Sequence, residues 1–147
     1  MLVKDVLKAK GRRIVSVPVF RTVGQILSLL AENNISSVVV SGSNGKPKGI
    51  VTDRLLIRVL ARRGADGLAL TAADVMESPA PACEADDSIQ EALWLMTDRR
   101  VRHLIVEEGG EAAGLVSIGD LVKYRLRDSE LEGRVLRDMA YARLAEG

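Results

Sequence analysis

Hydrophobic residues follow two different periods along the chain. Short β-branched runs predict strands, and longer segments with an apolar residue every three or four positions predict amphipathic helices. In the first half, the runs at 14–20, 35–42 and 48–53 are the predicted strands, and the segments at 22–34 and 54–64 are the predicted helices. The predicted order is therefore strand, helix, strand, strand, helix.

Turn residues support this assignment. Asn44-Gly45 separates the second and third predicted strands, and this pair is favoured in the tight turns of β-hairpins. Gly64 follows the last apolar residues of the second predicted helix, a position typical of a helix end. We therefore expect a hairpin followed directly by a helix.

The second half of the chain repeats the order of elements. Gly49 corresponds to Gly114 and Thr52 to Ser117, with an offset of 65 residues in both pairs. Two homologous copies are the simplest interpretation. The second copy has predicted strands at 80–85, 101–108 and 112–120, a turn at 109–111, and predicted helices at 86–100 and 121–128.

Each βαββα copy is too short to cover both faces of its own sheet. We therefore predict an α+β fold in which the two copies pack sheet to sheet, with a groove between them as the natural pocket. The expected divisions are a first domain with an N-terminal helix at 1–66, a linker and second domain at 67–128, and a C-terminal helix at 129–147. Within the linker, Thr71 is expected to cap a short helix at 74–76.

The C-terminal segment is amphipathic. We expect its apolar side to pack on the body of the protein or on a second chain, although Gly133 weakens its early part. The apolar residues near helical spacing are Leu131, Val135, Leu136, Met139 and Leu144.

Composition narrows the possible functions. The 147 residues carry 21 basic and 20 acidic side chains, and only 3% of the residues are aromatic, so neither a nucleic-acid nor a membrane partner is expected. No run of about 18 apolar residues and no signal peptide is present, which favours a cytoplasmic location. With Cys83 and His103 as the single cysteine and histidine, no zinc site and no other metal site is expected.

The stretch from Gly114 to Asp120 contains the candidate chemistry. It leaves a predicted strand through a glycine and places Ser117 and Asp120 three residues apart at the start of a helix. From spacing alone, a capping box and a ligand site are equally good interpretations. The first copy begins its helix at Thr52 without an acid, so the helix itself does not require Asp120.

These residues resemble a known family. The repeat, the segments VKDVLKAKG and DVMESP that precede each copy, and the stretch RVRHLIVEEGGEAAGLVSIGDLV are similar to a pair of cystathionine-β-synthase (CBS) domains, of the stand-alone bacterial type, over residues 3–127. The resemblance implies two CBS repeats related by a pseudo-two-fold axis. It also implies two clefts that bind adenosine-containing ligands, and a regulatory rather than catalytic role.

The family's ligand motif fits the second copy. Gly114, Leu115, Ser117 and Asp120 match it completely, which implies that Asp120 accepts the ribose hydroxyls and that Ser117 meets phosphate beside the first amides of the helix. The glycine would let the backbone come close to the ligand.

The first copy departs from the motif, because Leu55 stands at the acidic position. By the family pattern, the cleft with Asp120 includes Ser16 and Ser36, whereas the other cleft has Ala82 where Ser16 stands. Two losses fall on one cleft, so we expect a single competent site.

Two basic residues are candidates for phosphate. The resemblance places Arg102 and His103 toward phosphate, and the matching residues of the first copy are Ser36 and Ser37. A hydrogen-bonded structural histidine is an equally good interpretation of His103. Arg99 and Arg100 are interpreted as solvated charges.

The expected function is that of a regulatory sensor for AMP, or for ADP, ATP, NAD or S-adenosylmethionine, with no resident cofactor. The expected assembly is a homodimer formed by the helices at 22–34 and 87–99 and the second helix of each copy, acting on an unidentified target protein. The alternative is a ligand-free module for dimerisation or protein interaction. An enzyme is not expected, because no carboxylate is placed to orient His103 beside Ser117 or Cys83.

Overall fold

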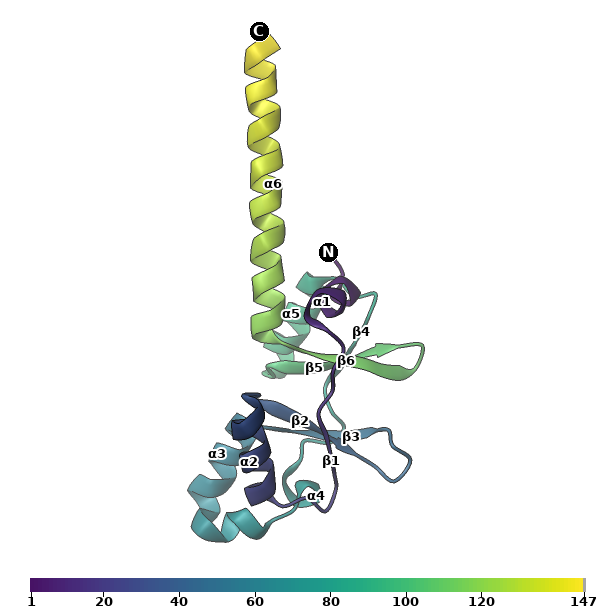
Figure 1. Cartoon of the computed structure of the whole chain (residues 1–147), viewed down its shortest axis with the longest axis vertical. Helices are drawn as coiled ribbons and strands as arrows, with labels where there is room; N and C mark the ends of the chain where they lie inside the picture. Colours follow the sequence, from purple (N-terminus) through teal and green to yellow (C-terminus); the bar gives the residue numbers. More distant parts are fainter. Residues whose placement is uncertain (147) are drawn as a thin grey trace.

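Two three-stranded sheets form the centre of the molecule (Figure 1). The structure is a computed structural model and describes residues 1–146. In each sheet the middle strand runs parallel to the first strand and antiparallel to the third. The strands are β1 (Ser16–Pro18), β2 (Ser37–Ser41), β3 (Pro47–Thr52), β4 (Ala82–Glu84), β5 (His103–Glu108) and β6 (Glu111–Ser117).

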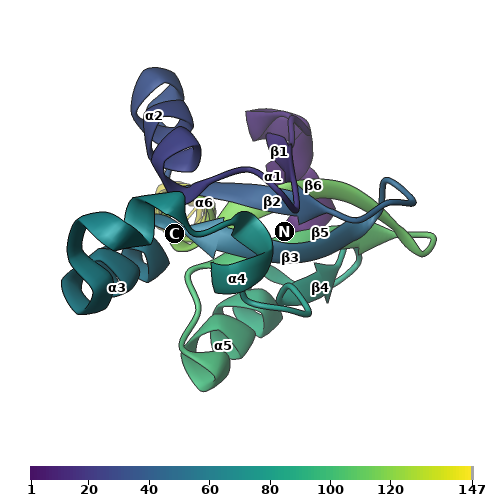
Figure 2. The same cartoon turned by 90° about the horizontal axis from the view of Figure 1, so that it is seen from below.

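The helices cover the outer faces of the two sheets (Figure 1, Figure 2). They are α1 (Val3–Lys10), α2 (Val23–Asn33), α3 (Asp53–Arg63), α4 (Ala72–Val75), α5 (Ile89–Arg99) and α6 (Ile118–Glu146), with a 3₁₀ helix η1 (Gly64–Ala69) that the sequence analysis did not predict. None of the helices within residues 1–146 has the length and apolar character needed to cross a membrane.

Alternate side chains of the middle strands, β2 and β5, point either into the core of their own copy or toward the other sheet. Val38 and Val40 belong to the first core, and Leu104 and Val106 belong to the second. Val39 and Ile105 are also buried but belong to neither core. Because successive strand residues point to opposite faces, Val39 and Ile105 face the other sheet. The predicted α+β fold, with two repeats packed sheet to sheet, is confirmed (Figure 1).

The N-terminal helix belongs structurally to the second copy. Val3, Val6 and Leu7 of α1 lie in the second core, and the Val3 amide donates to the Asp87 carbonyl at 2.8 Å. From the sequence, this helix is predicted to belong to the first domain, at 1–66. Local patterns do not reveal which sheet an amphipathic helix covers, because either sheet offers an apolar face.

The first copy receives the corresponding cover from the linker. Ala72 of α4 is buried in the first core, and Val75 and Met76 pack against that core. The short helix predicted after Thr71 is present, at Ala72–Val75 rather than 74–76. The covering helices are therefore exchanged between the copies. Helix α1 precedes the first copy in the chain but covers the sheet of the second, and α4 precedes the second copy but covers the sheet of the first.

The C-terminal part of the chain is one helix rather than two segments. Helix α6 runs for 29 residues from Ile118 to Glu146 and extends well beyond the body (Figure 1). Gly133 lies inside it, because one glycine costs a helix only about 1 kcal/mol and no proline interrupts the segment. Its apolar side chains Leu126, Leu131, Val135, Leu136, Met139, Tyr141 and Leu144 are exposed.

Candidate functional site

Two cavities open between the sheets, one at the start of each second helix. The cavity beside Asp120 has a volume of about 520 Å³, and the cavity beside Leu55 has a volume of about 110 Å³. His103 and Asp53 line both cavities. The asymmetry predicted from the replacement of the acid by Leu55 thus has a counterpart in the sizes of the two cavities.

Asp120 is held in a fixed position at the start of α6. Its Oδ2 accepts hydrogen bonds from Lys10 Nζ at 2.6 Å and from the Ser117 amide at 2.8 Å. The Ser117 hydroxyl accepts in return from the Asp120 amide at 3.1 Å. The capping box proposed from spacing is therefore formed, and it holds the carboxylate at the wall of the larger cavity.

The Asp120 carboxylate is ionised at neutral pH. Burial raises the pKa of Asp120, but the hydrogen bonds from Lys10 and Ser117 and the charge of Lys10 outweigh burial, so the pKa lies below its ordinary value. An ionised carboxylate is a strong acceptor for hydroxyl groups.

His103 connects the two copies. Its Nε2 lies 2.8 Å from the hydroxyl of Ser36, and the ring is only 8% exposed. Burial lowers the pKa of His103, and nearby Lys10 and Arg102 lower it further against the opposing charges of Asp53 and Asp120. The ring is therefore neutral at pH 7. Its observed contact with Ser36 is the one expected of a structural, hydrogen-bonded histidine.

The structure brings four of the seven predicted site residues together. Asp120, Ser117, Ser36 and His103 line the larger cavity. Ser16 is exposed on β1 and does not line this cavity, although its neighbour Val15 does.

Arg102 lies apart from the other predicted phosphate contacts. It lines the smaller cavity beside Leu55 and not the cavity beside Asp120. Arg102 precedes His103 at the start of β5, and adjacent residues at a strand end point in different directions. Only His103 of the predicted pair reaches the larger cavity.

Gly114 has a packing role that the sequence did not reveal. A Cβ atom at this position would lie 2.7 Å from Leu7 Cδ2, so the glycine lets α1 approach β6 closely. Gly49 is similar, because its Cβ would lie 2.7 Å from the Glu77 carbonyl oxygen and 2.8 Å from Met76 Sδ. Gly114 does not line the larger cavity, and its observed partner is the helix that covers the second sheet.

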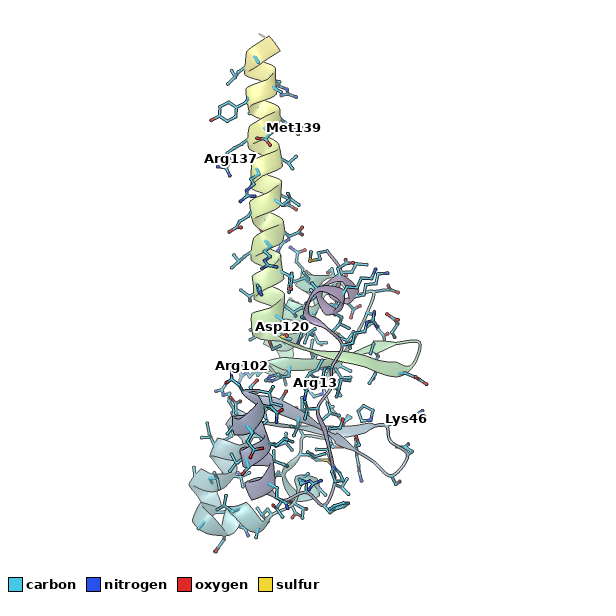
Figure 3. The ribbon with its side chains drawn as sticks, in the orientation of Figure 1. Arg13, Lys46, Arg102, Asp120, Arg137 and Met139 are labelled. Atoms are coloured by element: carbon cyan, nitrogen blue, oxygen red, sulfur yellow. The ribbon has the colours of Figure 1, made fainter. Side chains whose placement is uncertain are left out.

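Two cations were missed by the sequence analysis. Lys10 and Arg13 line the cavity beside Asp120. They lie there because the chain passes this cavity as it leaves α1 on the second copy and crosses to the first copy (Figure 3). The basic run from Lys10 to Arg13 was the available signal. Its placement required knowing that α1 packs on the second copy.

Comparison with known proteins identifies the repeats. The CBS domain profile matches residues 3–62 and 72–127. A CBS-domain-containing protein of Agrobacterium tumefaciens has a similar crystal structure, with 36% identity, a TM-score of 0.81, and coverage of 84% of this chain and 92% of that one. A CBS domain protein of Pyrobaculum aerophilum, solved in complex with AMP, has 26% identity, a TM-score of 0.72, and coverage of 82% of this chain and 89% of that one.

The curated relatives are longer than the matched region. An uncharacterised protein of Methanopyrus kandleri is 32% identical over 103 residues, which make up 69% of this chain and 53% of that protein. The chain thus spans about half the length of this relative.

Proposed function

Because the chain belongs to the CBS-domain family and carries two such domains in tandem, we propose that it is a regulatory module that binds one adenosine-containing ligand, with AMP as the first candidate. The ligand would occupy the cavity beside Asp120. The observation that carries the proposal is an ionised, positioned carboxylate at the wall of a cavity of about 520 Å³. Pockets for small molecules usually measure about 300–1,000 Å³.

The ribose would bind to Asp120. Within residues 1–146, the hydrogen bonds to this carboxylate all use Oδ2, which leaves Oδ1 for the ribose hydroxyls. Two hydroxyl donors on an ionised acceptor form charge-assisted hydrogen bonds, which are stronger than neutral ones.

The rest of the nucleotide would follow from the position of the ribose. Val15, Ile35 and Leu115 form the apolar part of the cavity wall and would pack against the adenine, close to Ser36. The phosphate would lie near Ser117 and the start of α6, where helix amides favour an anion. Arg13, which forms no ion pair within residues 1–146, would supply positive charge there, in the role first assigned to Arg102, while Lys10 is held by Asp120.

The AMP complex of the Pyrobaculum relative supports this ligand class. A sensor in this family acts by a change of shape, so we propose that binding shifts the angle between the two copies, which meet at the Ser36 to His103 hydrogen bond. A target protein would detect this change.

We test the proposal by calorimetric titration of AMP into the full chain and into Asp120→Asn. The expected result is one AMP per chain, with affinity about 30-fold weaker in the variant, because a hydrogen bond to a charged group contributes about 2 kcal/mol. The exposed Asp98, which lines neither cavity, gives the matched control Asp98→Asn. Equal affinity in all three proteins would contradict the ribose assignment.

The proposed module is a homodimer. Ile57 and Val122 occupy equivalent positions in the second helix of each copy, and their side chains are 66% and 42% exposed. Trp94 on α5 is 67% exposed. Large apolar side chains exposed on neighbouring helices mark an interaction surface.

A further inference from the structure

The cavity beside Leu55 differs chemically from the cavity beside Asp120. Its volume of about 110 Å³ is well below the range usual for drug-sized or nucleotide ligands. Leu55 cannot accept a hydrogen bond from a ribose hydroxyl. Any ligand here must be smaller than a nucleotide and must bind without a ribose contact to position 55.

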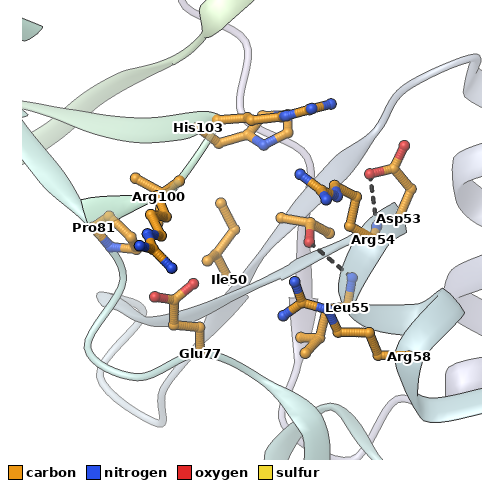
Figure 4. A pocket seen from close by; sticks show the side chains of 12 residues that line it. Ile50, Asp53, Arg54, Leu55, Arg58, Glu77, Pro81, Arg100 and His103 are labelled. Carbon is orange, nitrogen blue, oxygen red and sulfur yellow. Dashed lines mark hydrogen bonds between the residues drawn. The ribbon is translucent and has the colours of Figure 1, made fainter. Parts of the chain in front are cut away.

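Arginines from both copies gather around this cavity (Figure 4). Arg54 and Arg58 come from α3, and Arg100 and Arg102 come from the segment between α5 and β5. None of the four forms an ion pair with a carboxylate within residues 1–146. Their guanidinium groups are therefore available to an external anion.

Carboxylates lower the positive charge of the cavity but do not cancel it. Asp53 and Glu77 also line the wall, and one Asp53 oxygen accepts a hydrogen bond from the Arg54 amide at 2.8 Å. Four guanidinium groups against two carboxylates leave an excess of two positive charges. A dianion would balance this excess.

The backbone conformation of Arg100 is a second, independent observation in favour of an anion site in this cavity. Arg100 ends α5 with φ of +57°, in the left-handed region, and its side chain points into the cavity (Figure 4). The equivalent helix end in the first copy is Asn34, with φ of +51°. Asparagine and glycine are favoured in this conformation and arginine is not. The second copy therefore has a residue that is unfavourable for the backbone, Arg100, at a position from which its guanidinium group adds positive charge to the cavity.

We propose that the cavity beside Leu55 is a separate site for a small phosphate-type dianion without a nucleoside, either inorganic phosphate or diphosphate. The planar guanidinium group pairs with two oxygens of a phosphate at once, which suits arginine to this role better than lysine. Arg54 and Arg58 would contact the anion from the first copy, and Arg100 and Arg102 from the second. The anion would then join the two copies in the cavity that shares His103 and Asp53 with the Asp120 cavity.

The test compares variants that copy the residues of the first repeat. Arg100→Asn places at the end of α5 the residue that ends α2, and Arg102→Ser places there the residue equivalent to Ser36, so the double variant should fold normally. Phosphate and diphosphate are titrated calorimetrically at fixed ionic strength, because salt screens exposed charges. We expect binding of at least one of them to wild type, and at least tenfold weaker binding to the double variant.

Two controls separate this site from its surroundings. The exposed Arg99 does not line the cavity, so Arg99→Ala should bind the anion like wild type. Asp120→Asn should also keep anion binding, and the double variant should keep its affinity for AMP. The anion-binding results would hold whether or not AMP binds beside Asp120.

Three outcomes would overturn the proposal. Neither anion binds wild type, or Arg99→Ala weakens binding as much as the double variant does, or the double variant binds the anion as tightly as wild type. The relative affinities of phosphate and diphosphate identify which anion the site prefers.

Discussion

His103 is a single buried titratable group at the boundary of two cavities. Its pKa is lowered, first by burial, so the folded protein favours the neutral ring while the unfolded chain titrates near 6.5. Below pH 6.5 the unfolded state therefore binds more protons than the folded state. The contribution of His103 to the free energy of unfolding should be constant above that pH and should fall as the pH drops from 6.5 toward the folded pKa.

NMR titration of tag-free protein measures this effect directly, because His103 is the only histidine. We expect its ring protons to titrate below pH 6.5 in the folded protein. Replacement by Gln, which keeps a polar side chain near Ser36, should remove this contribution to the loss of stability between pH 6.5 and 5. A folded-state pKa at or above 6.5 would contradict the buried, neutral ring.

Asp120 and Ser117 could be identified from the sequence because their chemistry is local. Their spacing of three residues at a helix start determines both hydrogen bonds of the capping box. Lys10 is 110 residues away from Asp120 in the chain and meets it only through packing. The sequence could not show that Arg102 lines the smaller cavity, because the direction of a side chain at a strand end depends on where the strand pairing begins.

At the scale of elements, two glycines determine how closely the covering helices approach the sheets. Gly114 contacts Leu7 of α1, and Gly49 contacts Met76 after α4. The family motif begins at this glycine, yet its observed contact is with a helix on the outer face of the sheet.

Gly114→Ala should destabilise the protein by about 1–3 kcal/mol, the usual cost of overpacking a core. Leu7→Ala in the same chain should recover part of this loss, because the added methyl group would occupy space that the leucine vacates. Chemical denaturation of the two single variants and the double variant measures the coupling. Additive losses would show that Leu7 is not the residue that excludes a side chain at position 114.

Order and type of the elements could be predicted because apolar periodicity and turn residues act locally. The partner of α1 could not, because both sheets present an apolar face to an amphipathic helix. The continuity of α6 was missed for a different reason. The segment was divided after residue 128 and Gly133 was expected to weaken the second part, but the helix formers around this glycine outweigh its cost.

At the scale of the molecule, the pseudo-two-fold relation leaves equivalent apolar residues exposed on both copies. The proposed homodimer would cover Trp94, Ile57 and Val122. Sedimentation of wild type should give twice the chain mass of 15.9 kDa. Trp94→Glu should weaken the dimer at least tenfold, because it would place a charge in an apolar contact.

A matched control adds the same charge elsewhere. Ser43 is exposed in the hairpin between β2 and β3, away from the helices (Figure 1), so Ser43→Glu should leave the dimer unchanged. A wild-type monomer, or a Trp94→Glu variant that remains fully dimeric, would exclude this surface.

The most direct measurement is a crystal structure of the full chain grown with AMP. We expect one AMP per chain in the cavity of about 520 Å³, with both ribose hydroxyls within hydrogen-bonding distance of Asp120 and the adenine against Val15 and Ile35. An AMP molecule bound beside Leu55, with the cavity at Asp120 empty, would contradict it.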